Sequence, residues 1–161
     1  MPLKLWIDAD AMPREVKDVI FRAAKRIGLQ TILVANQGMP LPAASPMVTS
    51  VLVEGGADVA DQYIVDHAEA ADIAITADIP LAALLVGRGL AVIDPRGREY
   101  TPENVGEILS SRDLMYDLRG AGQITGGPPS FHSRDRQAFA NALDRVLTRR
   151  LGQAPGPGAS D

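Results

Sequence analysis

The sequence contains no cysteine among its 161 residues. Disulfides, zinc–thiolate sites, iron–sulfur clusters and thiol nucleophiles are therefore all excluded. Aromatic residues make up only 4% of the chain, so the core must be built mainly from alanine, valine, leucine and isoleucine. No apolar run approaches the length of a membrane span, and no cationic segment followed by a long apolar stretch opens the chain. We therefore expect a soluble, cytoplasmic protein.

Positive charge is also in short supply. Lysine and arginine together number 16 against 20 aspartates and glutamates, which gives a formal net charge of -4. The chain as a whole therefore has no basic field that would attract nucleic acid. A local strip of basic residues, or a metal ion that bridges to phosphate, would still allow nucleic acid to bind.

Short apolar runs alternate along the chain with longer helical patterns. Strands are predicted at residues 4–8, 31–35, 47–53, 72–76 and 90–93, and helices at 13–27, 57–70, 79–87, 104–118 and 133–151. This alternation predicts an α/β protein, a three-layer α/β/α fold with a central, mostly parallel sheet of about five strands.

The length and composition suit a single domain over residues 1–151, followed by a disordered tail at 152–161. A segment rich in glycine and proline, residues 120–129, is predicted to be a flexible flap. His132 follows this segment directly and is interpreted as a solvated loop histidine.

Polar side chains gather where the predicted strands end and where one helix begins. Right-handed crossovers place the carboxyl ends of parallel strands at one edge of the sheet, which is where such sheets bind ligands. A cluster of carboxylates repels itself unless a cation neutralises it, so we expect a site for Mg²⁺ or Mn²⁺. The candidate ligands are Asp8, Asp10, Asp58, Asp61 and Asp78, and the candidate supporting residues are Thr76 and Asn36.

Most of these acids also have a purely structural interpretation. Asp10 precedes Pro13 and is suited to capping the first helix. Asp58 is suited to the N-cap of helix 57–70, with Asp61 in the role of a capping-box acid. Asp78 is likewise suited to capping the helix that follows it. Capping and metal binding are compatible when they use different oxygens.

Other residues have structural interpretations alone. Asp94 precedes Pro95 and is typical of an acid that begins a turn. His67 shares the apolar face of its helix with Ile64, which predicts a core histidine. Trp6 lies within the first strand and is also interpreted as a core residue.

Two longer motifs carry a family resemblance. Residues 7–13 (IDADAMP) and 56–64 (GADVADQYI) resemble the YaiI/YqxD family of bacterial proteins, and the resemblance continues through 75–82 and 127–131. It covers nearly the whole chain up to the last helix. The family is itself similar to the PIN-like nuclease superfamily, in which a helical aspartate is followed by Thr-x-Asp after the next strand.

This resemblance implies a PIN-like fold and a site. Asp8, Asp61 and Asp78 would form the catalytic acidic core, with Thr76 in support. PIN nucleases usually add another acid, for which Asp10, Asp58 and Glu54 are the candidates. The implied activity is metal-dependent hydrolysis of phosphodiester bonds in RNA or another nucleic acid. The alternatives are an inactive PIN-like module that binds nucleic acid or protein, and a small-nucleotide phosphohydrolase, which the acidic net charge suits slightly better.

Overall fold

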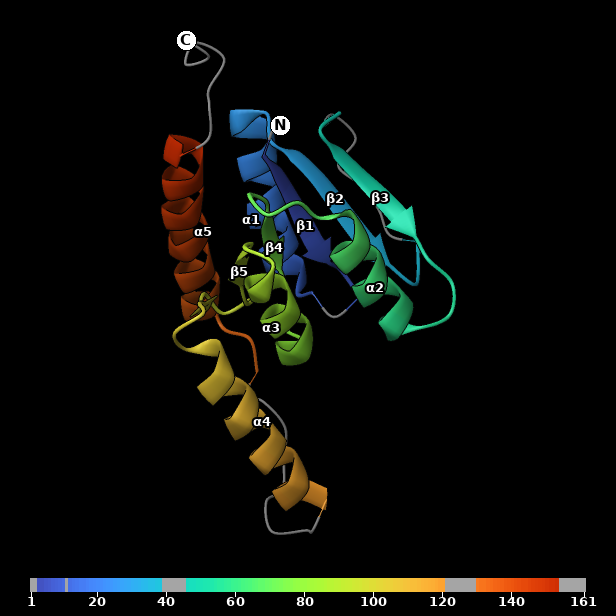
Figure 1. The fold of residues 1–161 in the computed structure, drawn as a ribbon. Coiled ribbons are helices and arrows are strands. Elements are labelled where there is room, and N and C mark those ends of the chain that lie inside the picture. Colours follow the sequence, from blue (N-terminus) through green and yellow to red (C-terminus); the bar gives the residue numbers. More distant parts are fainter. Residues whose placement is uncertain (1–2, 11, 39–45, 121–129, 154–161) are drawn as a thin grey trace.

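The computed structural model describes residues 3–10, 12–38, 46–120 and 130–153 (Figure 1). The expected flap at 121–129 and the last part of the expected tail, 154–161, lie outside the described residues. In chain order the elements are β1 (Lys4–Asp8), α1 (Arg14–Ile27), β2 (Gln30–Ala35), β3 (Val48–Leu52), α2 (Ala57–His67), β4 (Ile73–Ile75), α3 (Ile79–Gly87), β5 (Ala91–Ile93), β6 (Glu99–Tyr100), α4 (Val105–Gly120) and α5 (Ser133–Gln153). None of the helices described is both long enough and apolar enough to cross a membrane.

The strands form one sheet in the order β3-β2-β1-β4-β5-β6. β1 is central and pairs in parallel with β2 and β4, with Ile7 aligned to Leu33 on one side and Ile75 on the other. Only β6 is antiparallel, and it pairs with β5 through Val92 and Tyr100. The sheet therefore has six strands where the sequence predicted about five, because β6 is two residues long and has no apolar run of its own.

Helices cover both faces of the sheet and make the predicted three-layer α/β/α fold (Figure 1). On one face, α1 and α5 pack their apolar stripes against alternate residues of the strands. Buried Ile20 and Phe139 belong to this layer, together with Leu5, Ile7 and Leu33 of the sheet. Alternation along a strand sends the remaining strand residues to the other face, which α2 and α3 cover.

The opposite layer contains the chain's single tryptophan. Trp6 is 5% exposed, as predicted for a core residue, and its Nε1 donates to Asp72 Oδ2 at 2.9 Å. Asp72 is 1% exposed and also accepts from the backbone N–H groups of Lys4, at 3.1 Å, and Glu69, at 2.9 Å. These bonds join the start of β1 to the turn before β4.

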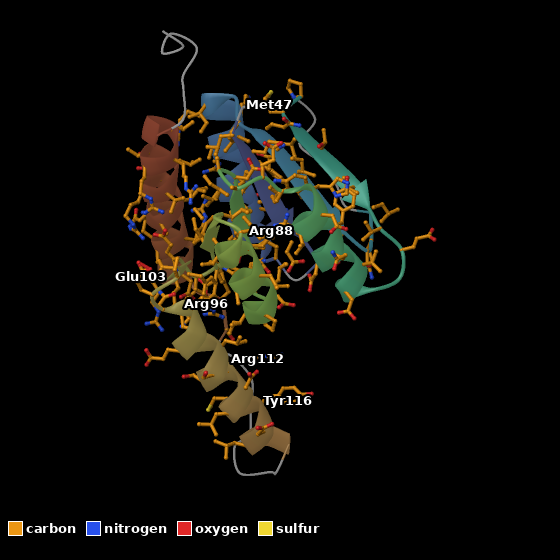
Figure 2. The ribbon with its side chains drawn as sticks, in the orientation of Figure 1. Met47, Arg88, Arg96, Glu103, Arg112 and Tyr116 are labelled. Carbon is orange, nitrogen blue, oxygen red and sulfur yellow. The ribbon has the colours of Figure 1, made fainter. Side chains whose placement is uncertain are left out.

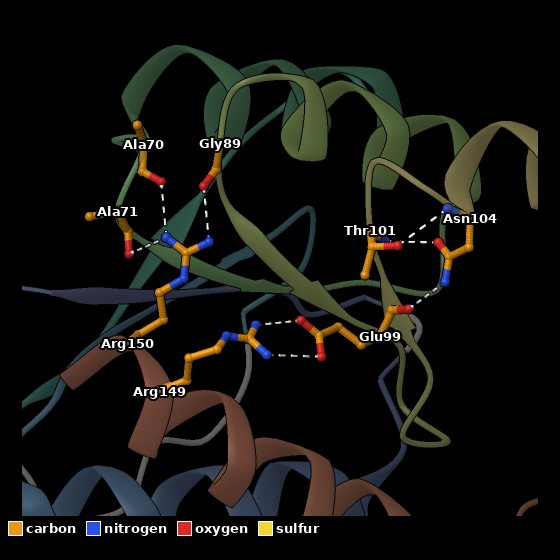
Figure 3. Close-up of polar contacts among 8 residues, drawn as sticks. All are labelled: Ala70, Ala71, Gly89, Glu99, Thr101, Asn104, Arg149 and Arg150. Carbon is orange, nitrogen blue, oxygen red and sulfur yellow. Dashed lines mark hydrogen bonds and ion pairs between the residues drawn. The ribbon is translucent and has the colours of Figure 1, made fainter. Parts of the chain in front are cut away.

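Both ends of α5 are fixed to the sheet side of the molecule. Near its C-terminal end, Arg150 donates to the carbonyl oxygens of Ala70, Ala71 and Gly89, and Arg149 pairs with Glu99 (Figure 3). Further toward its N-terminus, the helix lies against Gly97, where an added Cβ would be 2.6 Å from the carbonyl oxygen of Ala138. Gly97 has a φ of 96°, so both its backbone conformation and this close approach favour glycine.

Three details differ from the sequence prediction. Gly120 belongs to α4 and not to a flap, and Gly152 belongs to α5, so the first residues of the expected tail are helical. His67 is exposed and not in the core, because α2 ends there. Its ring stacks on Tyr63, with the two ring centroids 3.9 Å apart, and its Nδ1 lies 2.8 Å from the Tyr63 carbonyl oxygen.

Candidate functional site

A hydroxyl group links two of the predicted acids at the carboxyl edge of the sheet. Thr76, directly after β4, is 1% exposed, and its Oγ1 donates to Asp8 Oδ2 at 2.7 Å. The same Oγ1 accepts from the backbone N–H of Asp78 at 3.0 Å. Asp78 is the N-cap of α3, as predicted, and its Oδ1 accepts from Leu81 N at 2.9 Å. Thr76 therefore fixes the end of β1 relative to the start of α3.

Asp61 reaches the same place from the first half of α2. Its side chain is partly exposed and makes a hydrogen bond with Asp78. Burial and the negative charges of Asp78 and Asp8 raise the pKa of Asp61 to about 7, and the hydrogen bond with Asp78 and the charge of Asp58 act in the same direction. Three elements that are separate in the sequence thus bring three carboxyl groups together.

The pKa of Asp8 is also raised above its usual value. Burial is the main cause, and the charges of Asp78 and Asp10 add to it, while the hydrogen bond from Thr76 opposes them. Asp8 and Asp61 are therefore harder to ionise in the presence of the neighbouring carboxylates. A cation placed among them would reverse that effect.

Asp10 binds Asn36 and does not cap α1. Both of its carboxylate oxygens accept from Asn36 N, at 3.0 and 2.9 Å, and Oδ2 also accepts from Asn36 Nδ2 at 2.9 Å. The N-cap of α1 is Pro13, which has no side-chain capping bond. Asn36 Oδ1 accepts in turn from Gly56 N at 3.1 Å. The predicted supporting residue Asn36 thus joins the loop after β1 to the start of α2.

Asp58 and Asp61 do not form the capping arrangement that their spacing suggested. The N-cap of α2 is Gly56, with a φ of 100° and no side-chain capping bond. Glycine adopts this conformation without strain, so the helix begins two residues earlier than an Asp58 cap would require. Asp58 is exposed in the first turn, where its charge acts on Asp61. Glu54 is exposed on the preceding turn and is not among the groups that perturb Asp8 or Asp61.

Sequence reasoning missed the contribution of the hairpin between β5 and β6. Asp94 Oδ1 accepts from the backbone N–H groups of Arg96 and Arg98, both at 2.9 Å, as predicted for an acid that begins a turn. Beyond this turn, Tyr100 is 2% exposed, with the Arg98 guanidinium 5.4 Å from its ring centroid. Burial raises the pKa of Tyr100, and a hydrogen bond from Arg98 opposes this rise. The charges of Asp94 and Asp78 also raise it, which places this hairpin beside the acidic group.

The acids come together without forming a ready-made coordination sphere. Across the ranges that the structure describes, no group of three or more acidic or histidine side chains is arranged to hold a metal ion as it stands. The oxygens are engaged elsewhere, since Asp8 accepts from Thr76 and Asp78 accepts from Leu81. Metal binding would require these carboxylates to turn toward a common position.

Fold and site together define a three-layer α/β protein with a group of interacting aspartates at the carboxyl edge of a mostly parallel sheet. The model of the uncharacterised BCR, YaiI/YqxD family matches residues 6–149, and the chain belongs to this family.

Its relatives are similar over almost their whole length. A UPF0178 protein of Shewanella baltica (strain OS223) is 53% identical over 146 residues, which are 91% of this chain and 97% of the relative. A UPF0178 protein of Geobacter metallireducens is 54% identical over 149 residues, covering 92% and 96% of the two chains. One from Myxococcus xanthus is 50% identical over 153 residues, covering 95% and 99%. No solved structure matches the chain.

Proposed function

We propose that the protein is a Mg²⁺- or Mn²⁺-dependent phosphodiesterase that acts on RNA or another nucleic acid. The observation that carries the proposal is the meeting of Asp8, Asp61 and Asp78, from β1, α2 and the start of α3, around the buried hydroxyl of Thr76. Their order along the chain also resembles the acidic pattern of PIN-like nucleases.

The donor set suits a hard divalent cation because all of its atoms are carboxylate oxygens. Asp8, Asp61 and Asp78 would hold the ion, and Asp10 and Asp58 lie close enough for their charges to act on this group. When bound, the ion would supply charge stabilisation at a phosphoryl oxygen and activation of water.

The chain's own residues would orient this chemistry. Thr76 holds Asp8 in one rotamer through its 2.7 Å hydrogen bond, and the backbone N–H of Leu81 holds Asp78. Burial and the neighbouring carboxylates raise the pKa of Asp61 to about 7, so a cation bound here would favour its ionised form.

The test is metal binding and hydrolysis by the purified protein. Mn²⁺ binding is measured by calorimetry, and hydrolysis is measured with bis(p-nitrophenyl) phosphate and with labelled single-stranded RNA in Mn²⁺ and in EDTA. Asp8→Asn should abolish Mn²⁺ binding and hydrolysis. Asp66→Asn is the matched control, because Asp66 is an exposed acid on α2 outside the acidic group. Unchanged Mn²⁺ affinity in Asp8→Asn would contradict the proposal.

A non-catalytic module that binds nucleic acid or protein is the second candidate. It is favoured by one observation, that the described acids and histidines do not converge as they stand on a common metal position. RNA binding that persists in EDTA, with no cleavage in Mn²⁺, would support this second function over the first. Cleavage of mononucleotides with no effect on RNA would instead indicate a small-nucleotide phosphohydrolase.

A further inference from the structure

The second half of α4 carries three large side chains that are exposed. Figure 1 shows the helix extending past the strand ends, well away from the sheet. Leu114 is 59% exposed, Met115 37% and Tyr116 64%. Large apolar and aromatic side chains gathered on one helix end indicate a surface that meets a partner.

One face of this helix lines a groove that also includes the first residue of α3. The groove has a volume of about 480 Å³, and its lining from α4 consists of Glu107, Ile108, Ser111, Arg112, Met115 and Tyr116. These positions recur every three to four residues, so they form one continuous stripe along the helix. The other wall consists of Ile79 and Arg98. Ile79 directly follows Asp78 in the chain, so the groove includes the residue next to one of the three aspartates.

The groove combines cationic groups with an aromatic ring. The Arg112 guanidinium lies 5.4 Å from the ring centroid of Tyr116 and pairs with Asp113 at 3.0 Å, and both members of this pair are well exposed (Figure 2). Arg98 contributes a second guanidinium from the other wall, and Glu107 is the single acid among the lining residues. Arg98 and Arg112 balance Glu107 and the neighbouring Asp113, so these four residues carry no net charge, whereas the whole chain has a net charge of -4.

This chemistry fits a flexible polyanion with exposed rings. Guanidinium groups bind phosphates in a bidentate way, and a tyrosine ring stacks on nucleobases of any sequence. A phosphodiester brought to a cluster of aspartates also needs cations nearby, because the aspartates alone would repel it. In a duplex the bases already stack on each other, so an exposed tyrosine favours a single strand.

We propose that the groove between α4 and the β5–β6 hairpin binds a single-stranded nucleic acid, with Tyr116 stacking on a base and Arg98 and Arg112 binding the flanking phosphates. This inference rests on the proposed function, since the groove would lead the strand to Asp8, Asp61 and Asp78. It adds a substrate class, single-stranded rather than double-stranded, and a binding subsite outside the acidic group.

The experiment measures fluorescence anisotropy of a labelled single-stranded oligoribonucleotide of about ten nucleotides, in EDTA, so that no cleavage occurs. Tyr116→Ala should weaken binding by about tenfold or more, whereas Tyr116→Phe keeps the ring and should bind within about twofold of the wild type. Arg112→Ala should weaken binding and also reduce its dependence on salt. Circular dichroism checks that each variant is folded. We expect the variants to fold, because the side chains of Arg112 and Tyr116 are exposed.

Arg88→Ala is the matched control. Arg88 is an exposed arginine at the C-cap of α3, at the end of that helix opposite Asp78 (Figure 2). It should bind the oligonucleotide as the wild type does. A duplex of the same sequence should bind more weakly than the single strand.

Several results would overturn the inference. The wild type could fail to bind the oligonucleotide, Tyr116→Ala could bind as tightly as the wild type, or the duplex could bind more tightly than the single strand. If Tyr116→Ala dissociates a dimer without changing RNA affinity, the face is a contact between copies and the inference is wrong. Hydrolysis of bis(p-nitrophenyl) phosphate by the wild type in Mn²⁺ reports on the acidic group alone. Its absence, together with Tyr116-dependent RNA binding, would refute the proposed hydrolysis and support the subsite.

Discussion

At the scale of single residues, Asp61 is the side chain whose protonation depends most on its neighbours. Its pKa of about 7 in the folded protein lies above the ordinary value of 3.8. The folded state therefore binds the proton more tightly than the unfolded chain does. The stability that this proton contributes is complete below the unfolded pKa and is lost as the pH rises through about 7.

We therefore expect Asp61→Asn to change how stability depends on pH. Without metal, the free energy of unfolding of the variant should equal that of the wild type near pH 4 and exceed it by about 1 kcal/mol near pH 8. This difference is small because Asp61 is partly exposed to solvent. Urea denaturation in EDTA at the two pH values measures the difference. Asp66→Asn should leave the pH dependence unchanged. If the free energy of unfolding changed with pH in the same way for Asp61→Asn and the wild type, the proposed link between Asp61 protonation and stability would be wrong.

A second residue-scale prediction concerns buried Asp72, which accepts from Trp6, Lys4 and Glu69. Asp72→Ala leaves these donors without their acceptor, and we expect it to lower the free energy of unfolding by about 3 kcal/mol. The contact between Glu69 and Lys4 is more exposed, so Glu69→Ala should cost at most about 1 kcal/mol. Chemical denaturation compares the two variants. Equal losses would show that Asp72 has no special structural role.

At the scale of elements, the turn between β5 and β6 determines how closely α5 approaches the sheet. Gly97→Ala would place a Cβ 2.6 Å from the Ala138 carbonyl oxygen at a φ of 96°. We expect a loss of about 2–4 kcal/mol, because both the turn and the helix must shift. Gly106→Ala is the control, because Gly106 lies in α4 with open space around it. This substitution should raise the free energy of unfolding by about 0.5–1 kcal/mol. Thermal denaturation that ranks the two variants alike would contradict this account.

Sequence patterns predicted most elements but not the contacts between their ends. β1 contains the apolar run at residues 5–7 and β2 the apolar and β-branched run at residues 31–35, so these runs predicted where both strands lie. β6 was missed because it exists only by pairing with β5 across the Asp94 turn. The partner of Asp10 was equally hidden, because Asn36 is 26 residues away and the two meet only once β1 and β2 are paired. His67 was wrongly placed in the core because a helical wheel does not show where a helix ends.

In the candidate site, too, the sequence predicted which residues take part but not the contacts between them. The sequence predicted that Asp8, Asp61 and Asp78 would meet at the strand ends, and the charges of Asp8 and Asp78 act on Asp61 in the folded chain. That these three acids form a site stays a prediction. Thr76 was expected as a supporting residue. Its hydroxyl group donates a hydrogen bond to Asp8 and accepts one from the backbone N–H of Asp78. Tyr100 and Arg98 gave no signal in the sequence, because a hairpin of this length has no periodicity to read.

At the scale of the whole molecule, one sheet is shared by two apolar layers, so neither layer is stable alone. We expect unfolding to be a single cooperative transition. Trp6 fluorescence reports on the layer with α2 and α3, whereas far-ultraviolet circular dichroism reports on all helices. Leu143→Ala, in the opposite layer, should lower stability by about 2–5 kcal/mol and shift both signals together. Separate transitions for the two probes would indicate more than one folding unit.

The pairing of α1 with α5 also has a consequence for how the chain folds as it is made. α1 is synthesised early, but part of the cover for its apolar face, Phe139 and Leu143 of α5, follows more than a hundred residues later. At cellular rates of translation this delay is on the order of ten seconds. During that time the nascent chain has a sheet with one face incompletely covered, which is the state that molecular chaperones bind. The ribosome-bound protein should therefore depend on such protection until α5 emerges.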